Sequence, residues 1–221
     1  MFNFVESIGG YAHFSTISIL LIPLYLLYNY GSRSFLNSLI LVLLIFNLIS
    51  YYGVLLFNGS FDFRVHLPLH LCYFTEIIIL ISYILDTRFF YPWIFLNSLG
   101  GGISGFLNSI MVDESVPVEY LHHYLSHFNL LLFTIIYLKS KQAISIKELK
   151  NSIYFNAIIF TFALFFNLKF NSNYWFTMYK PSGDNLSVLF PSWPYYLILF
   201  ILIGLTSYVV SYQLVKEKSY G

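Results

Sequence analysis

The chain has 221 residues, of which 58% are hydrophobic and 10% are charged, and its formal net charge is +1. An ordinary soluble domain carries roughly 25% charged residues, so this chain has too little polar surface to cover a water-soluble globule. The near-neutral charge provides no strong basic or acidic field for a charged partner. The composition therefore predicts an integral membrane protein that does not bind nucleic acid.

Seven apolar runs follow one another along the chain, each close to the roughly 20 residues that a helix needs to cross a bilayer. They cover residues 11–30, 35–57, 67–85, 91–112, 120–138, 149–168 and 193–214. Helices satisfy their backbone donors and acceptors within their own segment, as hydrocarbon requires, and the period-two pattern of a barrel is absent. The sequence predicts an all-α, polytopic transmembrane bundle of about seven helices that forms one domain over residues 1–221.

Lysine and arginine are unevenly distributed between the short loops. If the N-terminus is outside, the inner loops carry eight of these cations, namely Arg33, Arg88, Lys139, Lys141, Lys147, Lys150, Lys216 and Lys218. The outer loops then carry only three, namely Arg64, Lys169 and Lys180. Because cytoplasmic loops are enriched in lysine and arginine, the sequence predicts a multi-pass protein of the cell membrane with its N-terminus outside and its C-terminus inside.

The histidines and the single cysteine share one feature in this orientation, because all of them fall near the outer ends of helices. They are His13, His66, His70, Cys72, His122, His123 and His127. One interpretation is that interfacial positions tolerate amphipathic rings. The other is that the extracytoplasmic face carries a functional site.

The third predicted helix begins with the segment Leu67-Pro-Leu-His-Leu-Cys72. Pro68 fits the first turn of a helix, where a missing N–H costs nothing, and the positive end of the helix dipole favours a thiolate at Cys72. His70 lies about 200° from Cys72 around a helix, so we expect it to support the site rather than act as its base. Glu76 is one turn deeper and can either orient a histidine across the bundle or stay neutral and bonded to serine or tyrosine.

The fifth predicted helix contributes His123 and His127, whose i, i+4 spacing places them on one face with Ser126 beside them. A cysteine from one helix and a histidine from another form the activated nucleophile of covalent acyl transfer. The alternative is that Cys72 is a small core residue and that the histidines bond to carbonyl groups.

The two spaced pairs His66/His70 and His123/His127 also raise the question of a zinc site, because two such pairs with an aspartate or cysteine can supply tetrahedral ligands. Pro68 weakens the zinc interpretation, because the turn that holds His66 need not be helical and His66 and His70 need not then share a face. We therefore predict no metal site and no cofactor.

Two outer cations, Arg64 and Lys180, are candidates for binding a lipid phosphate, although interfacial snorkelling explains each of them as well. The segment Gly100–Gly105 of the fourth predicted helix is rich in small residues, which let helices approach closely. We expect this segment to serve packing rather than ligand binding.

Four segments in order give the chain a family resemblance: Leu67-Pro-Leu-His-Leu-Cys72, the helix with His123 and His127, Asn173-Tyr-Trp-Phe with Lys180-Pro-Ser182, and Trp193-Pro-Tyr-Tyr196. With them the chain resembles the YwaF-like bacterial integral membrane proteins, whose distant eukaryotic relative is transmembrane protein 164. The resemblance runs from about the second helix to the last.

The resemblance implies an activity, because the eukaryotic relative is an acyltransferase that moves fatty acyl chains between phospholipids without a coenzyme A donor and uses a cysteine nucleophile. By this resemblance Cys72 is the acyl acceptor and His123 or His127 is the base. Phe128 follows His127 where the family pattern leads us to expect a small residue, which leaves open which histidine acts.

The leading hypothesis is a membrane-embedded lipid acyltransferase or acyl hydrolase whose partners are membrane phospholipids. Ser126, Asn173 and Tyr174 are candidate donors to the oxyanion. The alternatives are a transporter or lipid-binding protein with no covalent step, and a zinc-dependent membrane lipid hydrolase. The sequence leaves the lipid headgroup and the oligomeric state open.

Overall fold

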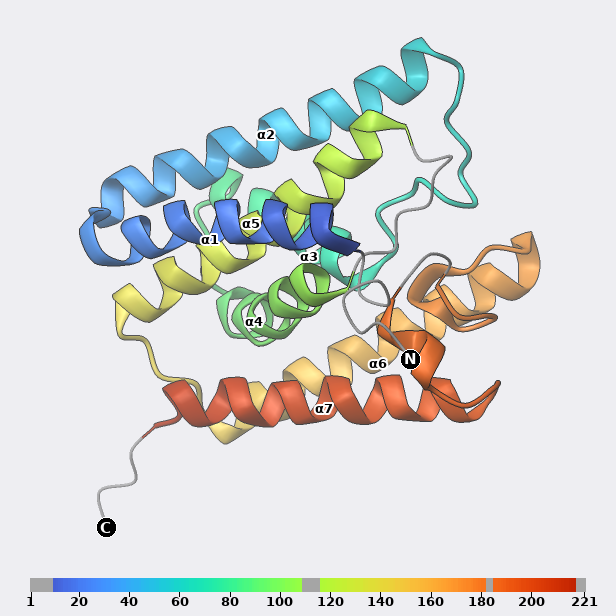
Figure 1. Cartoon of the computed structure of the whole chain (residues 1–221). Helices are drawn as coiled ribbons and strands as arrows, with labels where there is room; N and C mark the ends of the chain where they lie inside the picture. The colour runs from blue at the N-terminus through green and yellow to red at the C-terminus, as the bar shows by residue number, and fades with distance from the viewer. Residues whose placement is uncertain (1–9, 109–115, 182–184, 218–221) are drawn as a thin grey trace.

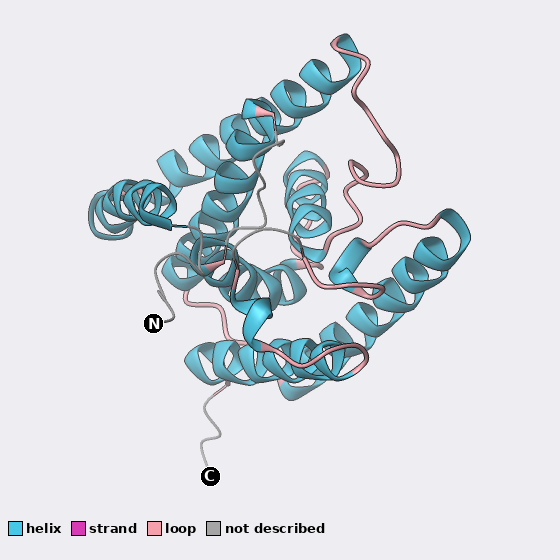
Figure 2. Cartoon of the chain, turned by 45° about the vertical axis from the view of Figure 1, so that its right-hand side comes forward, coloured by secondary structure: helices cyan, strands magenta, loops and turns pink. Residues whose placement is uncertain are grey.

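The protein is helical throughout the residues that a computed structural model describes, which are 10–108, 116–181 and 185–217. These residues form seven α-helices and no strand, apart from an isolated bridge between Ile144 and Lys216 (Figure 2). The α-helices are α1 Gly10–Tyr30, α2 Arg33–Phe57, α3 Leu71–Ile84, α4 Tyr91–Leu107, α5 Pro117–Ser140, α6 Ile146–Phe170 and α7 Tyr195–Val215 (Figure 1). Two short 3₁₀ helices, η2 Tyr174–Phe176 and η3 Leu186–Leu189, connect α6 to α7. The predicted all-α class is confirmed.

Each of the seven predicted runs corresponds to one helix, and the main difference lies at the start of α3. The prediction placed Pro68 in the first turn of a helix, but α3 begins only at Leu71 and Pro68 lies in the turn before it. The Tyr174 hydroxyl accepts a hydrogen bond from the Leu67 N–H at 2.9 Å. The Trp175 indole N–H donates to the Leu69 carbonyl at 2.7 Å. These tertiary bonds hold the segment in a turn, so the prediction for Pro68 was wrong. The predicted fourth run also extends past α4 into residues 109–112, which lie outside the described residues.

Three helices of the described chain, α2, α6 and α7, are long and apolar enough to cross a membrane, whereas α3 has 14 residues and is shorter. Only 17% of the spanning part of α6 and 11% of that of α7 is buried. Most of their apolar side chains therefore face outward, as expected of helices surrounded by lipid.

The centre of the bundle is formed by α4 and α5, and glycines of α4 bring the backbones together. A Cβ built at Gly102 would lie 2.6 Å from Cγ of Leu131 and 3.2 Å from the carbonyl oxygen of His127, both on α5. A Cβ at Gly100 would overlap the side chain of Ser207 on α7. Small residues therefore let α5 and α7 approach α4 closely.

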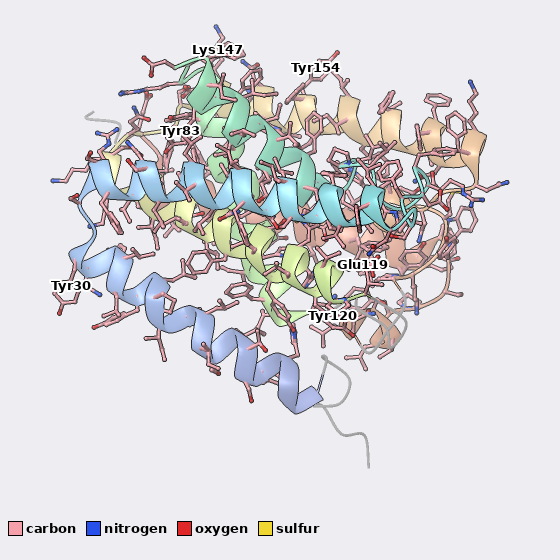
Figure 3. All side chains as sticks on the ribbon, turned by 90° about the horizontal axis from the view of Figure 1, so that it is seen from above. Tyr30, Tyr83, Glu119, Tyr120, Lys147 and Tyr154 are labelled. Carbon is pink, nitrogen blue, oxygen red and sulfur yellow. The ribbon has the colours of Figure 1, made fainter. Side chains whose placement is uncertain are left out.

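The helices run between two ends of the bundle (Figure 1). At one of them lie the starts of α1, α3, α5 and α7 together with η2 and η3. Figure 3 shows Glu119 and Tyr120 toward this end and Tyr30 and Tyr83 toward the other. We call it the histidine end, since the turn before α3 and the first halves of α1, α3 and α5 contain His13, His66, His70, Cys72, His122, His123 and His127. Which end faces the outside of the cell stays a prediction.

Candidate active site at the histidine end

Glu76 of α3 is fully buried and joins three helices through its carboxyl group. Its Oε1 accepts hydrogen bonds from Nδ2 of Asn47 at 2.8 Å and from Nδ2 of Asn129 at 2.7 Å. Its Oε2 accepts from Oγ of Ser126 at 2.7 Å. The three donors come from α2 and α5, and they provide the hydrogen bonds without which a buried carboxyl group is costly.

Asn47 extends this network to His122. Because Nδ2 of Asn47 donates to Glu76 and to Ser126 at 2.8 and 2.9 Å, its Oδ1 is the atom that accepts from Nδ1 of His122 at 3.1 Å. Nδ1 of His122 therefore carries the proton, and Nε2 carries the lone pair. The ring stacks on Tyr51 with centroids 3.8 Å apart, and its buried Nε2 has no hydrogen-bond partner among the described residues.

Both contacts predicted for Glu76 occur here, and its function stays a prediction: the carboxyl accepts from Ser126, and it also orients a histidine, with two differences from the prediction. The carboxyl acts through Asn47 rather than by direct contact, and the oriented ring is His122, which was not among the predicted site residues. The available signal was an asparagine inside the apolar span of α2, since polar side chains at that depth need a partner.

The backbone determines where the proton sits on His127. Nδ1 of His127 lies 2.6 Å from the carbonyl oxygen of His123, one helical turn earlier. A carbonyl can only accept a hydrogen bond, so Nδ1 carries the proton and Nε2 is left with a lone pair. The ring packs directly on α4, because a Cβ built at Gly105 would overlap Nε2, Cδ2 and Cγ of His127.

His123 adopts the opposite tautomer. Its Nε2 lies 3.2 Å from the carbonyl oxygen of Gly105, so Nε2 carries the proton and the lone pair is on Nδ1. That Nδ1 is buried and has no partner within the described part of the chain. The two rings are neighbours with centroids 4.6 Å apart, but only His127 holds its lone pair against the glycines of α4.

Cys72 is the second residue of α3 and lies against the same surface of α4. Its Sγ would be 3.2 Å from a Cβ built at Gly101, one turn before Gly105. Residues four apart share a helix face. The thiol of Cys72 and the lone pair of His127 therefore contact adjacent turns of one glycine face, which we define as Gly101 and Gly105.

His70 supports the neighbouring loop rather than contacting Cys72. It is the N-cap residue of α3, and its Nδ1 accepts a hydrogen bond from the Trp175 N–H at 3.3 Å. Its ring lies edge-on to that of Tyr174, with centroids 5.2 Å apart. His70 therefore holds the junction between η2 and α3, and its role in the site stays a prediction.

Each of the three candidate oxyanion donors donates a hydrogen bond to another group of the protein. The side chain of Asn173 donates to the carbonyl of Tyr179 at 2.8 Å, and the hydroxyl of Tyr174 donates to the carbonyl of Phe63 at 2.7 Å. Ser126 donates to the carboxyl group of α3. In this structure the three residues hold the network and the η2 loop together.

A residue that the sequence did not single out, Asn167 of α6, fixes this loop. It is fully buried, and its Nδ2 donates to the Tyr174 carbonyl at 2.7 Å and to Oγ1 of Thr177 at 2.8 Å. Its Oδ1 accepts from the Tyr174 N–H at 2.9 Å. Between these anchors Trp175 and Phe176 have φ angles of 59° and 52°, a left-handed conformation that is strained for aromatic residues.

The two predicted headgroup cations have partners within the protein. Arg64 pairs with Asp62 at 2.7 Å, and hydrogen bonds from its guanidinium lower the pKa of Asp62 to about 2. Nζ of Lys180 donates to the carbonyl of Phe190 at 2.6 Å. A lipid phosphate would therefore have to compete with these internal bonds.

The histidine pairs do not form a metal site in the described part of the chain. His66 lies in the turn before α3, where it accepts from the Asp62 N–H at 2.8 Å and contacts Oε1 of Glu119 at 3.3 Å. No three histidine, cysteine, aspartate or glutamate side chains of the described residues are arranged to hold an ion. The geometry offers no support for the zinc alternative.

Comparison with known proteins identifies a family. The model of the TMEM164 family matches residues 8–212, which is nearly the whole chain. Searches of curated proteins and of solved structures found no match. The match agrees with the relation to transmembrane protein 164 that the four segments indicated, while membership of the YwaF-like bacterial group stays a prediction. By this match the chain, with its long apolar helices, belongs to the TMEM164 family of membrane proteins.

Proposed function

We propose that the chain is a multi-pass protein of the cell membrane that acts as a lipid acyltransferase or acyl hydrolase through an acyl-cysteine at Cys72. The observation that supports this most is the glycine face of α4, where the Cys72 thiol and the Nε2 lone pair of His127 contact adjacent turns. A thiol and an imidazole that can accept its proton are the two groups of an activated nucleophile, and the proposal requires them to meet along this face. With the predicted orientation the reaction takes place at the extracytoplasmic face.

The proposed reaction uses His127 first as a base and then as an acid. Nε2 of His127 takes the proton of Cys72, and the thiolate attacks the ester carbonyl carbon of a phospholipid. The tetrahedral intermediate breaks its C–O bond, and the leaving lysolipid oxygen takes the proton from the imidazolium, which leaves a thioester on Cys72. A lysolipid hydroxyl or water then attacks the thioester, gives its proton to His127 and releases the thiolate, which is reprotonated.

The position of its lone pair favours His127 over His123 as the base, because only Nε2 of His127 lies against the glycine face. Replacing His127 with glutamine removes the lone pair that faces the glycine face, so acyl transfer should fall by at least about 100-fold. The same change at His123 keeps a donor for the Gly105 carbonyl and should have a much smaller effect. Rates of transfer from labelled phosphatidylcholine to lysolipid measure both variants, and a larger loss in His123→Gln would reverse the assignment.

The thioester itself provides the direct test of the proposed function. Purified protein in vesicles with acyl-labelled phosphatidylcholine should retain label on the peptide that contains Cys72, and neutral hydroxylamine should remove it. The Cys72→Ala variant should retain no label and make no product. Added lysolipid distinguishes transfer from hydrolysis, since only transfer yields a new labelled phospholipid. Undiminished activity in Cys72→Ala would eliminate the proposal.

A further inference from the structure

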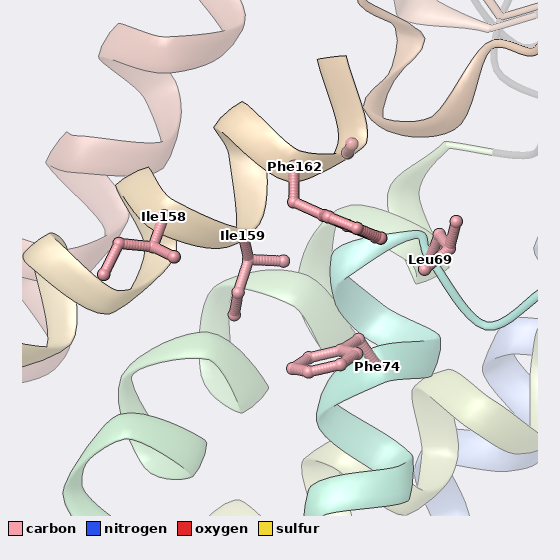
Figure 4. A pocket seen from close by; sticks show the side chains of 6 residues that line it. Leu69, Phe74, Ile158, Ile159 and Phe162 are labelled. Carbon is pink, nitrogen blue, oxygen red and sulfur yellow. The ribbon is translucent and has the colours of Figure 1, made fainter. Parts of the chain in front are cut away.

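A cavity of about 250 Å³ lies between the start of α3 and the middle of α6 (Figure 4). Six residues line it, namely Leu69, Phe74, Ile158, Ile159, Phe162 and Ala163. All six side chains are apolar, so a water molecule there would lack the polar partners that hold buried water. The cavity therefore favours a hydrocarbon occupant.

The exposure of its walls shows which way the cavity opens. Ile159 and Ala163 are buried and form the inner wall, whereas Ile158 and Phe162 are 51% and 56% exposed. The exposed pair lies on the outward surface of α6, one of the helices long and apolar enough to span the membrane. In a bilayer this surface faces acyl tails, so a tail can enter the cavity without passing through water.

The cavity is also close to the proposed nucleophile along the chain. Leu69 lies in the turn directly before α3, and Phe74 follows Cys72 by two residues in its first turn, so this wall of the cavity and the thiol both lie at the start of α3. Cys72 and Phe74 point to sides of the helix about 200° apart. The cavity and the thiol thus lie on opposite sides of α3, and the inference requires an acyl chain that bends around the start of this helix.

We infer that this cavity binds the distal part of the acyl chain that is transferred, and that the protein consequently prefers long acyl chains over short ones. The inference rests on the proposed function for the identity of the ligand. A short chain ends before the cavity, whereas a long one gains the burial of its terminal carbons there.

Filling the cavity should remove the preference for long chains. Ala163→Phe places a ring in the inner wall, while Ala157→Phe makes the same change on the exposed face of the same helix and is the matched control. The ratio of transfer rates for palmitoyl and octanoyl phosphatidylcholine should fall about tenfold in Ala163→Phe and stay unchanged in Ala157→Phe. Ala163→Leu, a smaller filling, should give an intermediate ratio and serves if the phenylalanine variant does not fold.

Binding can be measured without catalysis. Vesicles of phosphatidylcholine that carries a diazirine at the end of one acyl chain should, on irradiation, label residues 158–163 of the Cys72→Ala variant and label them much less in Cys72→Ala combined with Ala163→Phe. If residues 158–163 are labelled but the unmodified protein shows no acyl transfer, the cavity binds an acyl chain and the proposed function is removed. The inference is overturned if the protein is active but labelled elsewhere, and if the chain-length ratio is unchanged in Ala163→Phe and Ala163→Leu. The proposed function would then still stand.

Discussion

Replacing Gly105 with alanine should lower acyl transfer by at least about 100-fold, since misplacing a catalytic group by even about 1 Å has effects of that size. The new methyl group would overlap three ring atoms of His127. The ring cannot simply rotate away, because its Nδ1 donates to the His123 carbonyl at 2.6 Å. We therefore expect Nε2 to leave the glycine face, and with it the proton acceptor for Cys72.

A matched control for this variant exists in the same chain. Gly204 of α7 has no atom within 4 Å of a Cβ built on it, so Gly204→Ala should leave both turnover and the thermal unfolding midpoint unchanged. Gly105→Ala should also lower that midpoint in detergent micelles, because overpacking typically destabilises by about 1–3 kcal/mol. A Gly105→Ala variant with full activity would show that the position of the His127 ring is irrelevant to the reaction.

Replacing Glu76 with alanine should lower the free energy of unfolding by about 3 kcal/mol or more, because each buried donor left without a partner costs about 1–3 kcal/mol. Three side chains, Asn47, Ser126 and Asn129, would lose their acceptor at once. The effect should be measurable as a large fall in the thermal unfolding midpoint in detergent micelles. The ring of His122 should also lose its fixed orientation, because Asn47 would no longer be held by Glu76.

Two further variants distinguish the loss of stability due to the hydrogen bonds of Glu76 from the effect of removing any carboxylate. Glu76→Gln keeps one acceptor oxygen and the volume of the side chain, so it should be destabilised less than Glu76→Ala. Glu217 lies on the surface beyond α7, and Glu217→Ala should behave like the unmodified protein. If Glu76→Ala and Glu217→Ala unfold at the same point, the buried network does not stabilise the bundle.

The positions of the helices could be predicted from the sequence because apolar runs of membrane length leave few alternatives. The start of α3 could not, since Leu67 and Leu69 are held by Tyr174 and Trp175 from a loop about a hundred residues later. Local sequence signals, such as a proline that fits the first turn, carry no information about such distant partners.

The sequence could predict which residue types lie together at one end of the bundle, but not which histidine presents its lone pair to the proposed site. The spacing of His123 and His127 placed both rings on one face, and the start of α3 placed Cys72 at the same end. The choice between the rings depends on which carbonyl each one meets. His127 meets the His123 carbonyl of its own helix, whereas His123 meets the Gly105 carbonyl only when α5 packs on α4. Asn47 and Asn167 were overlooked, although a lone amide in an apolar span is itself a signal for a buried polar contact.

The network around Glu76 also bears on the order in which the protein can assemble during synthesis. Asn47 of α2 precedes its carboxyl partner by 29 residues and its serine partner by 79. When α2 reaches the membrane, neither α3 nor α5 is yet in place beside it, so its amide has to wait for these two partners. The link between α2, α3 and α5 can close only after α5 has been inserted, which makes this helix the one that completes the network.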